Sequence, residues 1–501
     1  MALSAFGALL LGIATVFGFA PFGASALPIL TLAGLFALWR QAATPRAAGC
    51  IGFAFGAGLF GAGVSWVYVA LSAFGEMPPV LAAMATVCFC AYLALFPALV
   101  GWCSARLAPI GSGVRLVLAA PLWTLAEWLR SWLLSGFTWL SIGYSEQTAA
   151  LAGYAPIGGV LLVSLAIASA AALLVHAALA VEERRLPVAA IDVAALLAAG
   201  AVGVALSTVE WSRPAEELIA VSLVQGNIPQ DVKFDPQYRA SSLSTYADLV
   251  ARAKGRLIVL PESALPMFAD EVPADYVAGL REVARKNGGD ILLGLFFFEP
   301  RTSADEDDRY FNTVVSVGAA TTQVYRKRHL VPFGETIPLK PLFGWFIRGV
   351  LNIPLADQTP GPAYQEAFAV AGERVAVNIC YEDAFSDVIN RSLPEATLLV
   401  NVTNDAWYGR SLAAEQHEQI AAMRALETSR PMLRATNTGI TSIIDHHGAE
   451  LARLPWFSRG VLEGRIAGRT GTTPYVRFGD TVVVLAALLL VGAALLIRRL
   501  A

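Results

Sequence analysis

Charge is scarce in this chain of 501 residues, and that scarcity excludes an ordinary soluble protein. Charged residues make up 15% of the sequence and hydrophobic residues 56%, with a mean hydropathy of +0.57, whereas soluble domains carry about 25% charged residues. The apolar excess also excludes a disordered chain. A net charge of −3 and a pI near 6.0 give no basic surface for nucleic acid. The composition predicts an integral membrane protein.

Lysine is absent from residues 1–212, which hold only 14 of the 75 formal charges. No basic segment precedes the first apolar run, because the first arginine is Arg40, and this argues against a cleaved signal peptide. Four uncharged stretches are each long enough for one or two membrane spans of about 20 residues: Met1–Trp39, Ala47–Gly75, Met77–Ala105 and Gln147–Val181. We expect two short helices in 1–39 and further spans near 49–73, 79–105, 116–134, 157–181, 187–207 and 481–497, about eight in all.

The basic residues between these spans predict the orientation. Cytoplasmic loops of membrane proteins are enriched in Lys and Arg. If the N-terminus is cytoplasmic, every basic pair between or after spans falls on the cytoplasmic side: Arg40/Arg46, Arg106/Arg115, Arg184/Arg185 and Arg498/Arg499. Three parts follow: residues 1–212 with seven transmembrane helices, residues 213–480 as an exported domain, and residues 481–501 with the last span and a cytoplasmic basic end.

Residues 213–480 alternate between β-rich runs and helical periods, which predicts an α/β domain. The expected strands are Leu218–Val224, Leu257–Leu260, Ile291–Phe298, Thr313–Val317, Gln323–Tyr325, Val375–Ile379, Leu398–Val402 and Ile440–Ile444. The expected helices are Ser241–Lys254, Ala274–Asn287 and Ala413–Thr428.

Cysteine is rare as well, and its five occurrences exclude a disulfide scaffold. Four lie in or beside the expected spans, so Cys380 is the one cysteine of residues 213–480 and has no disulfide partner there. It ends the hydrophobic strand Val375–Ile379, where α/β sheets present reactive groups. Cys380 is therefore a candidate nucleophile, with a buried core thiol as the alternative.

Two further segments carry candidate groups at strand ends. Glu262 follows Leu257–Leu260 and Pro261, which cannot continue a central strand, so a general base is expected there. Lys327 follows the expected strand Gln323–Tyr325, and Glu335 follows a Pro-Phe-Gly turn. Taken singly, Glu262 and Glu335 fit ordinary exposed acids, and Lys327 fits an ordinary exposed base, at least as well as they fit catalytic groups.

In this order Glu262, Lys327 and Cys380 resemble the Glu–Lys–Cys triad of the nitrilase (carbon–nitrogen hydrolase) superfamily. Within it, four strings look like the apolipoprotein N-acyltransferase family: Val-Gln-Gly-Asn-Ile-Pro-Gln (224–230), Leu-Val-Pro-Phe-Gly-Glu (330–335), Ile-Cys-Tyr-Glu (379–382) and Asn-Val-Thr-Asn-Asp-Ala-Trp (401–407). Phe234 departs from the Trp that we expect in the family. The resemblance implies a transmembrane helical bundle plus an exported αββα sandwich of the nitrilase type.

The resemblance also implies the reaction. Cys380 would attack an ester of a phospholipid, preferably phosphatidylethanolamine, and form an acyl thioester. The α-amine of an S-diacylglyceryl cysteine, at the N-terminus of a diacylated apolipoprotein, would then accept the acyl chain. Glu262 would move the protons and Lys327 would stabilise the thiolate and the oxyanion. We expect a monomer in the bacterial inner membrane, with the catalytic domain on the periplasmic side.

Supporting roles are assigned to neighbouring residues. The N–H of Tyr381 is expected to bind the oxyanion with Lys327. Glu335 is expected to orient Lys327 and Glu382 to support the Cys380 loop, although both also fit ordinary salt-bridge partners. Phe234, Asn404, Trp407 and Trp345 are the expected substrate-lining residues. Trp345 lies in 341–355, which fits a lid that dips into the membrane or a plain hydrophobic arm.

Motifs for other chemistries are absent. His329, His417, His446 and His447 show no HExxH spacing and no His/Cys cluster for zinc, and no glycine-rich phosphate loop occurs. We expect no metal and no cofactor. A membrane-tethered amidase would also use the triad but needs only one anchor. A transporter or receptor with an exported binding domain would explain the spans but not the triad.

Overall fold

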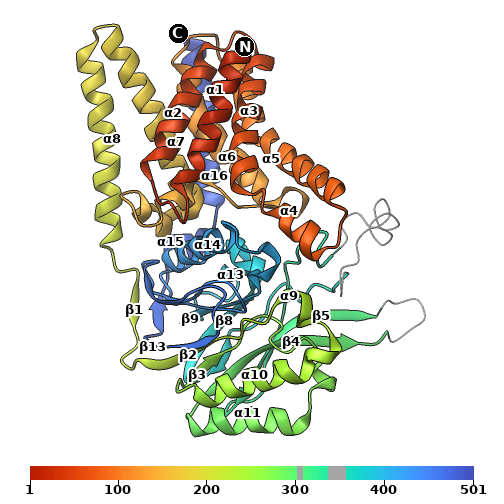
Figure 1. Ribbon diagram of the computed structural model, residues 1–501. Helices are drawn as coiled ribbons and strands as arrows, with labels where there is room; N and C mark the ends of the chain where they lie inside the picture. Colours follow the sequence, from red (N-terminus) through yellow and green to blue (C-terminus); the bar gives the residue numbers. More distant parts are fainter. Residues whose placement is uncertain (302–307, 337–356, 501) are drawn as a thin grey trace. The chain divides into compact units, whose positions relative to one another are not determined.

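The computed structural model describes residues 1–301, 308–336 and 357–500 (Figure 1). Two compact units are formed. The first contains Met1–Tyr68, Val80–Glu210 and Arg477–Ala501; the second contains Val69–Pro79 and Trp211–Val476. Trp345 and the segment 341–355, for which we expected a lid or a plain hydrophobic arm, lie outside the described residues.

The first unit is built of apolar helices. They are α1 (Ala2–Thr15), α2 (Ala26–Gln41), α3 (Pro45–Gly63), α5 (Pro79–Leu107), α6 (Val114–Trp132), α7 (Ala155–Glu182), α8 (Leu186–Ser207) and α16 (Thr481–Leu500). Among the described helices, α5, α7, α8 and α16 are long and apolar enough to cross a membrane, and α3 with the following Val67–Phe74 gives a fifth candidate. Helices α1 and α2 are apolar but shorter. These helix lengths and their apolar composition indicate a membrane-embedded helical region.

Helix α6 buries its charged side chains. Arg115 donates to the main-chain oxygens of Trp39 (2.9 Å) and Ala42 (2.7 Å) at the end of α2. Glu127 accepts from the indole of Trp123 and from the N–H of Ile142, both at 2.9 Å. These side chains satisfy main-chain groups at helix ends and loops, where intrahelical partners are missing.

The span expected over 49–73 is not one straight helix in the structure but a pair of helices bent by 57° at a break. Helix α3 ends at Gly63, and two short pieces follow, α4 (Val67–Val69) and η2 (Ala70–Phe74). The segment Val69–Pro79 belongs to the second unit.

The second unit contains two six-stranded sheets. The first has the order β13-β2-β3-β4-β5-β6, with β2 Ile219–Gln225, β3 Leu257–Val259, β4 Asp290–Glu299, β5 Arg309–Gly318, β6 Val324–Arg326 and β13 Gly460–Ile466. The second has the order β12-β11-β10-β9-β8-β7, with β7 Phe368–Val370, β8 Glu373–Ile379, β9 Leu398–Thr403, β10 Met432–Thr436, β11 Thr441–Ile444 and β12 Glu450–Leu454. A short pair, β1 (Ser212–Pro214) and β14 (Arg469–Gly471), adds a third small sheet.

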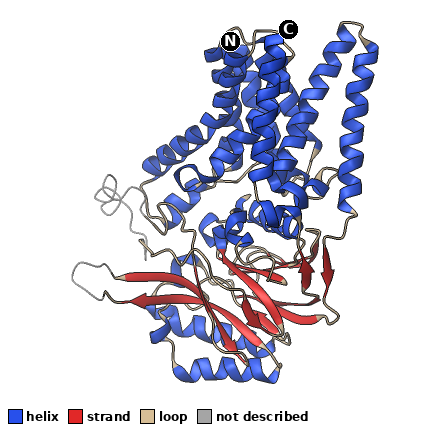
Figure 2. Cartoon of the chain, turned by 180° about the vertical axis from the view of Figure 1, so that it is seen from behind, coloured by secondary structure: helices blue, strands red, loops and turns tan. Residues whose placement is uncertain are grey.

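Helices cover the outer faces of both large sheets (Figures 1 and 2). Helices α10 (Arg239–Arg252) and α11 (Ala274–Lys286) share one buried apolar core with β2, β3, β4 and β5. Helix α14 (Ala413–Thr428) and the short α13 (Ser386–Asn390) share a second core with β8, β9, β10 and β11. Strands β2 and β10 touch across the two sheets, so the layers run α–β–β–α. This is the nitrilase-like fold that the resemblance implied.

Parallel pairing brings functional segments to one edge. Strand β3 runs parallel to β2 and β4, and β8 runs parallel to β9. Their carboxyl ends therefore lie at the same edge of each sheet. Glycine at 294 in β4 is required here, because a Cβ atom would lie 2.5 Å from the oxygen of Pro261 and 2.7 Å from the nitrogen of Ser263. The turn that carries Glu262 can pack closely against β4 only without that side chain.

Candidate functional site

Glu262, Lys327 and Cys380 follow β3, β6 and β8 and meet in a buried site of the second unit. The Lys327 ammonium lies 3.3 Å from Glu262 Oε1 and 2.7 Å from Glu335 Oε1. Cys380 interacts electrostatically with both Glu262 and Lys327. Lys327 is 1% exposed, and Glu262 and Cys380 are each 6% exposed. The structure thus brings together three residues that are widely separated along the chain and come from both sheets.

The backbone at Cys380 has an unusual conformation. Its φ is +53°, in the left-handed region, and it is the first residue of the short helix η8 (Cys380–Ala384) directly after β8. A non-glycine residue pays about 1–2 kcal/mol for that conformation. Such outliers concentrate at functional sites, where the surrounding structure enforces them. The sharp change from strand to helix presents the thiol at the strand end.

The resting site holds a protonated thiol beside an ion pair. Burial raises the pKa of the Cys380 thiol, the negative charge of Glu262 raises it further, and Lys327 only partly opposes them, so the pKa lies well above its usual value. Burial lowers the pKa of Lys327, but Glu262 and Glu335 more than compensate and raise it. Glu262 is therefore positioned to accept the thiol proton when the thiol reacts, while Lys327 stays positive.

The two supporting carboxylates are both held by specific donors. Glu335 uses Oε1 for Lys327 and Oε2 for the N–H of Val331 at 2.9 Å. Glu382 is fully buried and accepts four hydrogen bonds, from the main-chain nitrogens of Arg328 (2.6 Å), His329 (3.0 Å) and Ile379 (2.7 Å) and from the hydroxyl of Tyr325 (2.9 Å). Glu382 thereby connects the segment after β6, which carries Lys327, with the end of β8, which carries Cys380.

The expected lining residues differ in their surroundings. Phe234 is half-buried, and its ring lies 6.4 Å from that of Phe296. Trp407 is half-buried and makes an edge contact with Phe74 of the same unit, with ring centroids 6.1 Å apart. Asn404 is buried; its amide donates to Gln230 at 2.8 Å and accepts from Asn437 at 3.0 Å. Its side chain therefore ties three segments together.

Sequence reasoning missed Lys233 and Asn312. Lys233 is 2% exposed; its ammonium donates to the main-chain oxygen of Glu262 at 3.1 Å and interacts electrostatically with Cys380. The amide of Asn312 donates to Glu262 Oε1 at 2.7 Å. Lys233 directly precedes Phe234, which was expected to line the substrate site. This neighbour in the sequence was the available indication that Lys233 lies near the site. Asn312 lies within a strand and gave no signal.

A buried charge cluster near Cys380 was also missed. It consists of Asp383, Asp405, His417 and Arg434, all at most 2% exposed. His417 has no metal-binding spacing to other histidines or cysteines, so no local pattern marks it. Its partners lie 12 and 34 residues away in the chain.

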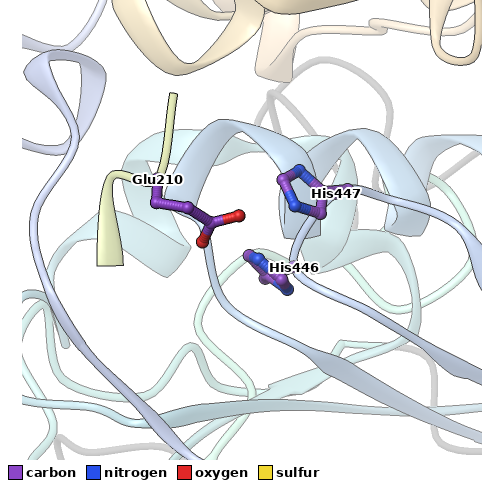
Figure 3. A group of neighbouring side chains, drawn as sticks. All are labelled: Glu210, His446 and His447. Carbon is purple, nitrogen blue, oxygen red and sulfur yellow. The ribbon is translucent and has the colours of Figure 1, made fainter. Parts of the chain in front are cut away.

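His446 and His447 lie side by side in the turn between β11 and β12 (Figure 3), with ring centroids 3.9 Å apart. Figure 3 also labels Glu210, the last residue of one segment of the first unit. In the described part of the second unit, no three His, Cys, Asp or Glu side chains place one ligand atom each within 4.8 Å of one another. These histidines are also separate in sequence from the segments that form the triad site.

Two family models match different parts of this chain and together cover most of it. The carbon-nitrogen hydrolase family matches residues 220–475, and the apolipoprotein N-acyltransferase N-terminal domain matches residues 11–173. The first match covers the second unit, including all three residues of the triad. The second covers most of the apolar helices.

Curated relatives match over nearly the whole chain. A protein of Nitrosomonas europaea named apolipoprotein N-acyltransferase is 49% identical over 489 residues, which is 96% of this chain and 95% of the relative. Proteins with the same name from Methylococcus capsulatus and Ralstonia nicotianae are 44% and 43% identical and cover 94% and 98% of this chain, and 91% and 93% of their own. A solved carbon-nitrogen hydrolase from Helicobacter pylori matches 50% of this chain and 89% of its own at 16% identity, with a TM-score of 0.35.

Proposed function

Because the chain belongs to the apolipoprotein N-acyltransferase family, we propose that it transfers a fatty acyl chain from a phospholipid to the N-terminal α-amine of diacylglyceryl-cysteine in apolipoproteins. The preferred donor is phosphatidylethanolamine, and the acyl chain is carried as a thioester on Cys380. The observation that carries the proposal is the thiol of Cys380 at the end of β8, beside the ion pair of Lys327 and Glu262.

In the first half-reaction, Glu262 accepts the proton of the Cys380 thiol, and the sulfur attacks the ester carbonyl of the phospholipid. A carbon–sulfur bond forms and the bond from the carbonyl carbon to the glycerol oxygen breaks. The departing oxygen takes the proton from Glu262 and leaves as lysophospholipid. Lys327 and the N–H of Tyr381 stabilise the oxyanion, where losing one donor typically costs about 2.7–4 kcal/mol.

In the second half-reaction, the neutral α-amine of the diacylated acceptor attacks the thioester carbonyl. Glu262 accepts the amine proton as the carbon–nitrogen bond forms. The carbon–sulfur bond then breaks, and the sulfur takes the proton back. An ester has been exchanged for an amide, and the enzyme returns to its starting protonation state. Glu262 therefore serves as base and acid in both halves.

The same proposal includes the membrane arrangement. Residues 1–212 and 481–501 cross the bacterial inner membrane with about eight spans, residues 213–480 form the periplasmic catalytic domain, and both termini are cytoplasmic. The basic residues of the loops support this orientation by the positive-inside rule. Lipid substrates support it as well, because their acyl chains lie in the bilayer and the thiol must work near the headgroups. We propose that the enzyme acts as a monomer.

The thioester is tested by the intact mass of the detergent-purified protein after incubation with phosphatidylethanolamine. We expect a fatty-acyl adduct that is absent from Cys380→Ala and that disappears when a diacylated lipopeptide is added. Cys103→Ala, in helix α5, is the matched control and should retain the adduct. An adduct that clears equally fast in water alone would identify a lipid hydrolase, and no adduct in the wild type would reject the proposal.

The orientation is tested with single introduced thiols and a membrane-impermeant maleimide. Glu282 lies exposed on α11, and Arg184 lies exposed between α7 and α8. In cells whose outer membrane has been permeabilised, Glu282→Cys should be labelled, whereas Arg184→Cys should be labelled only after lysis. The reverse pattern would refute a periplasmic domain.

A further inference from the structure

Four charged side chains form a closed network near the nucleophile. Arg434 donates to Asp383 Oδ2 at 3.1 Å and to Asp405 Oδ2 at 2.9 Å. The other oxygens of the same carboxylates face His417, with Asp383 Oδ1 at 2.9 Å from Nε2 and Asp405 Oδ1 at 2.8 Å from Nδ1. All four side chains are at most 1% exposed. Burying so many charges is costly unless each is paired, as here.

The geometry fixes the protonation state of His417. Ionised carboxylates can only accept hydrogen bonds, and an imidazole nitrogen donates only when it carries a proton. Both ring nitrogens lie within hydrogen-bond distance of a carboxylate oxygen, so both must be protonated. With His417 as an imidazolium, the two positive and two negative charges of the network cancel. A neutral ring would leave one carboxylate facing a nitrogen lone pair in a dry environment.

The network reaches the backbone of the nucleophile. His417 Nε2 lies 3.3 Å from the carbonyl oxygen of Cys380, and the amide of Asn401 donates to the same oxygen at 3.1 Å. Asn401 in turn accepts from Arg434 at 2.7 Å. The amide of Asn401 therefore holds this carbonyl, and the cationic Nε2–H of His417, which donates chiefly to Asp383 Oδ1 at 2.9 Å, also faces it as the longer branch of a shared hydrogen bond. The carbonyl belongs to a residue with φ of +53°, a conformation that needs such support.

Holding the carbonyl of Cys380 also fixes the N–H of Tyr381. The two groups belong to one planar trans peptide and point in opposite directions. We propose that the His417 imidazolium, held by Asp383, Asp405 and Arg434, is a positioning residue that aims and polarises the Tyr381 N–H as the oxyanion donor. This inference rests on the proposed acylation of Cys380. The physical reason is that a positive charge beside the Cys380 carbonyl oxygen polarises the peptide and makes the Tyr381 N–H a stronger hydrogen-bond donor.

The test compares His417→Gln with His417→Asn. A glutamine amide nitrogen can reach the position of Nε2 and donate to the Cys380 carbonyl. An asparagine amide is one methylene shorter and reaches only the position of Nδ1, so it keeps the contact to Asp405 but not the one to Cys380. Two rates are measured in each variant at one pH: acyl-adduct formation from phosphatidylethanolamine vesicles, and alkylation of Cys380 by iodoacetamide, resolved by peptide mass. Alkylation forms no oxyanion and therefore reports only on the thiol.

We expect His417→Gln, which keeps the hydrogen bond but loses the charge, to acylate about three- to tenfold more slowly than the wild type, and His417→Asn, which loses both, about 10- to 100-fold more slowly, a partial loss of one oxyanion donor. Alkylation should change less than about threefold in both. Equal acylation rates in the two variants, or a parallel fall of acylation and alkylation in His417→Asn, would overturn the inference. Failure of the wild type to form an adduct would instead reject the proposed function.

A second variant keeps the test decisive if the histidine variants do not fold, as judged by thermal melting. Asn401→Ala removes the amide that donates to the Cys380 carbonyl beside His417 and leaves the four charges in place. It should slow acylation by about tenfold and leave alkylation unchanged. Unchanged acylation in this variant would show that the direction of the carbonyl does not matter and would count against the inference.

Discussion

At the scale of single residues, the thiol of Cys380 is held in its protonated form. Burial and the charge of Glu262 raise its pKa, and Lys327 does not offset them. The rate of alkylation of Cys380 by iodoacetamide should therefore keep rising with pH beyond pH 9, since only the thiolate reacts. Peptide mass analysis separates Cys380 from the other cysteines. A rate that levels off below pH 8 would mean a resting thiolate and would contradict this description.

Lys233 adds a second positive charge to the same site. Burial lowers its pKa to about 8, although Glu262 and Cys380 both raise it. We expect Lys233→Met to slow acyl-adduct formation by about tenfold, because a nearby cation shifts the pKa of an acidic group by about one unit or more. The apparent affinity for phospholipid should stay the same.

The control for this prediction is Lys254→Met, which removes an exposed lysine beyond the end of α10 and should leave the rate unchanged. Lys233→Arg should recover part of the lost rate, since it keeps the charge. A loss of phospholipid affinity without loss of rate would instead assign Lys233 to headgroup binding.

Which residues meet at the candidate site was predictable from the sequence only where the signal was local. Glu262 and Cys380 each stand directly after a hydrophobic strand, which a short window reveals. Lys233 and Asn312 contact Glu262 from 29 and 50 residues away. No pattern around either position indicates that contact, because it is created by the pairing of the strands and the stacking of the sheets.

At the scale of elements, Glu382 holds together the segments that follow β6 and β8. Its carboxylate accepts four hydrogen bonds, and burial raises its pKa to about 7 despite three main-chain donors and Lys327. We expect Glu382→Gln to lower the thermal midpoint by about 4–10 °C, since an amide nitrogen would face N–H donors and each hydrogen bond to a charged group contributes about 1.5–3 kcal/mol.

Two further variants grade this effect. Tyr325→Phe removes one donor only and should cause a smaller loss, while Glu395→Gln removes an exposed charge and should cause none. Differential scanning fluorimetry in detergent measures all three. Equal midpoints for Glu382→Gln and Glu395→Gln would show that Glu382 does not join the two segments.

Eight strands of the second unit were predicted from the sequence, whereas β1, β7, β10, β12, β13 and β14 were not, and β10 shows one reason. Its sequence is Met-Leu-Arg-Ala-Thr, and a central arginine argues against a buried strand. The strand is nevertheless fully buried, because Arg434 is neutralised by Asp383 and Asp405. These partners are contributed by other segments, so the charge of Arg434 could be judged only in the folded structure.

At the scale of the whole molecule, composition separates the apolar helices from the α/β unit but hides where one segment belongs. Residues 69–73 were expected to end a membrane span, yet they lie in the segment Val69–Pro79, which belongs to the second unit. The edge contact of Phe74 with Trp407 is part of the reason. Hydropathy reports how apolar a segment is and carries no information about the surface on which it packs.

Global stability should depend on pH through His417. Burial and Arg434 lower its pKa, but Asp383 and Asp405 raise it to a net value of about 9, above the ordinary value of about 6.5. The folded protein thus keeps a proton that the unfolded chain loses between these values. The resulting stabilisation is complete below about pH 6.5 and is lost as the pH rises through about 9, by up to about 1.4 kcal/mol per pH unit.

The stability difference between the wild type and His417→Gln isolates this contribution, because other titrating groups such as Glu382 and Lys233 are common to both proteins. The gap between their thermal midpoints should be largest at pH 6 and should shrink steadily up to pH 9.5, since the glutamine amide does not titrate. Denaturation in detergent across this range provides the measurement. A gap of constant size would mean that His417 keeps the same charge in the folded and unfolded states, and the charge balance of the network would then have to be met by another group.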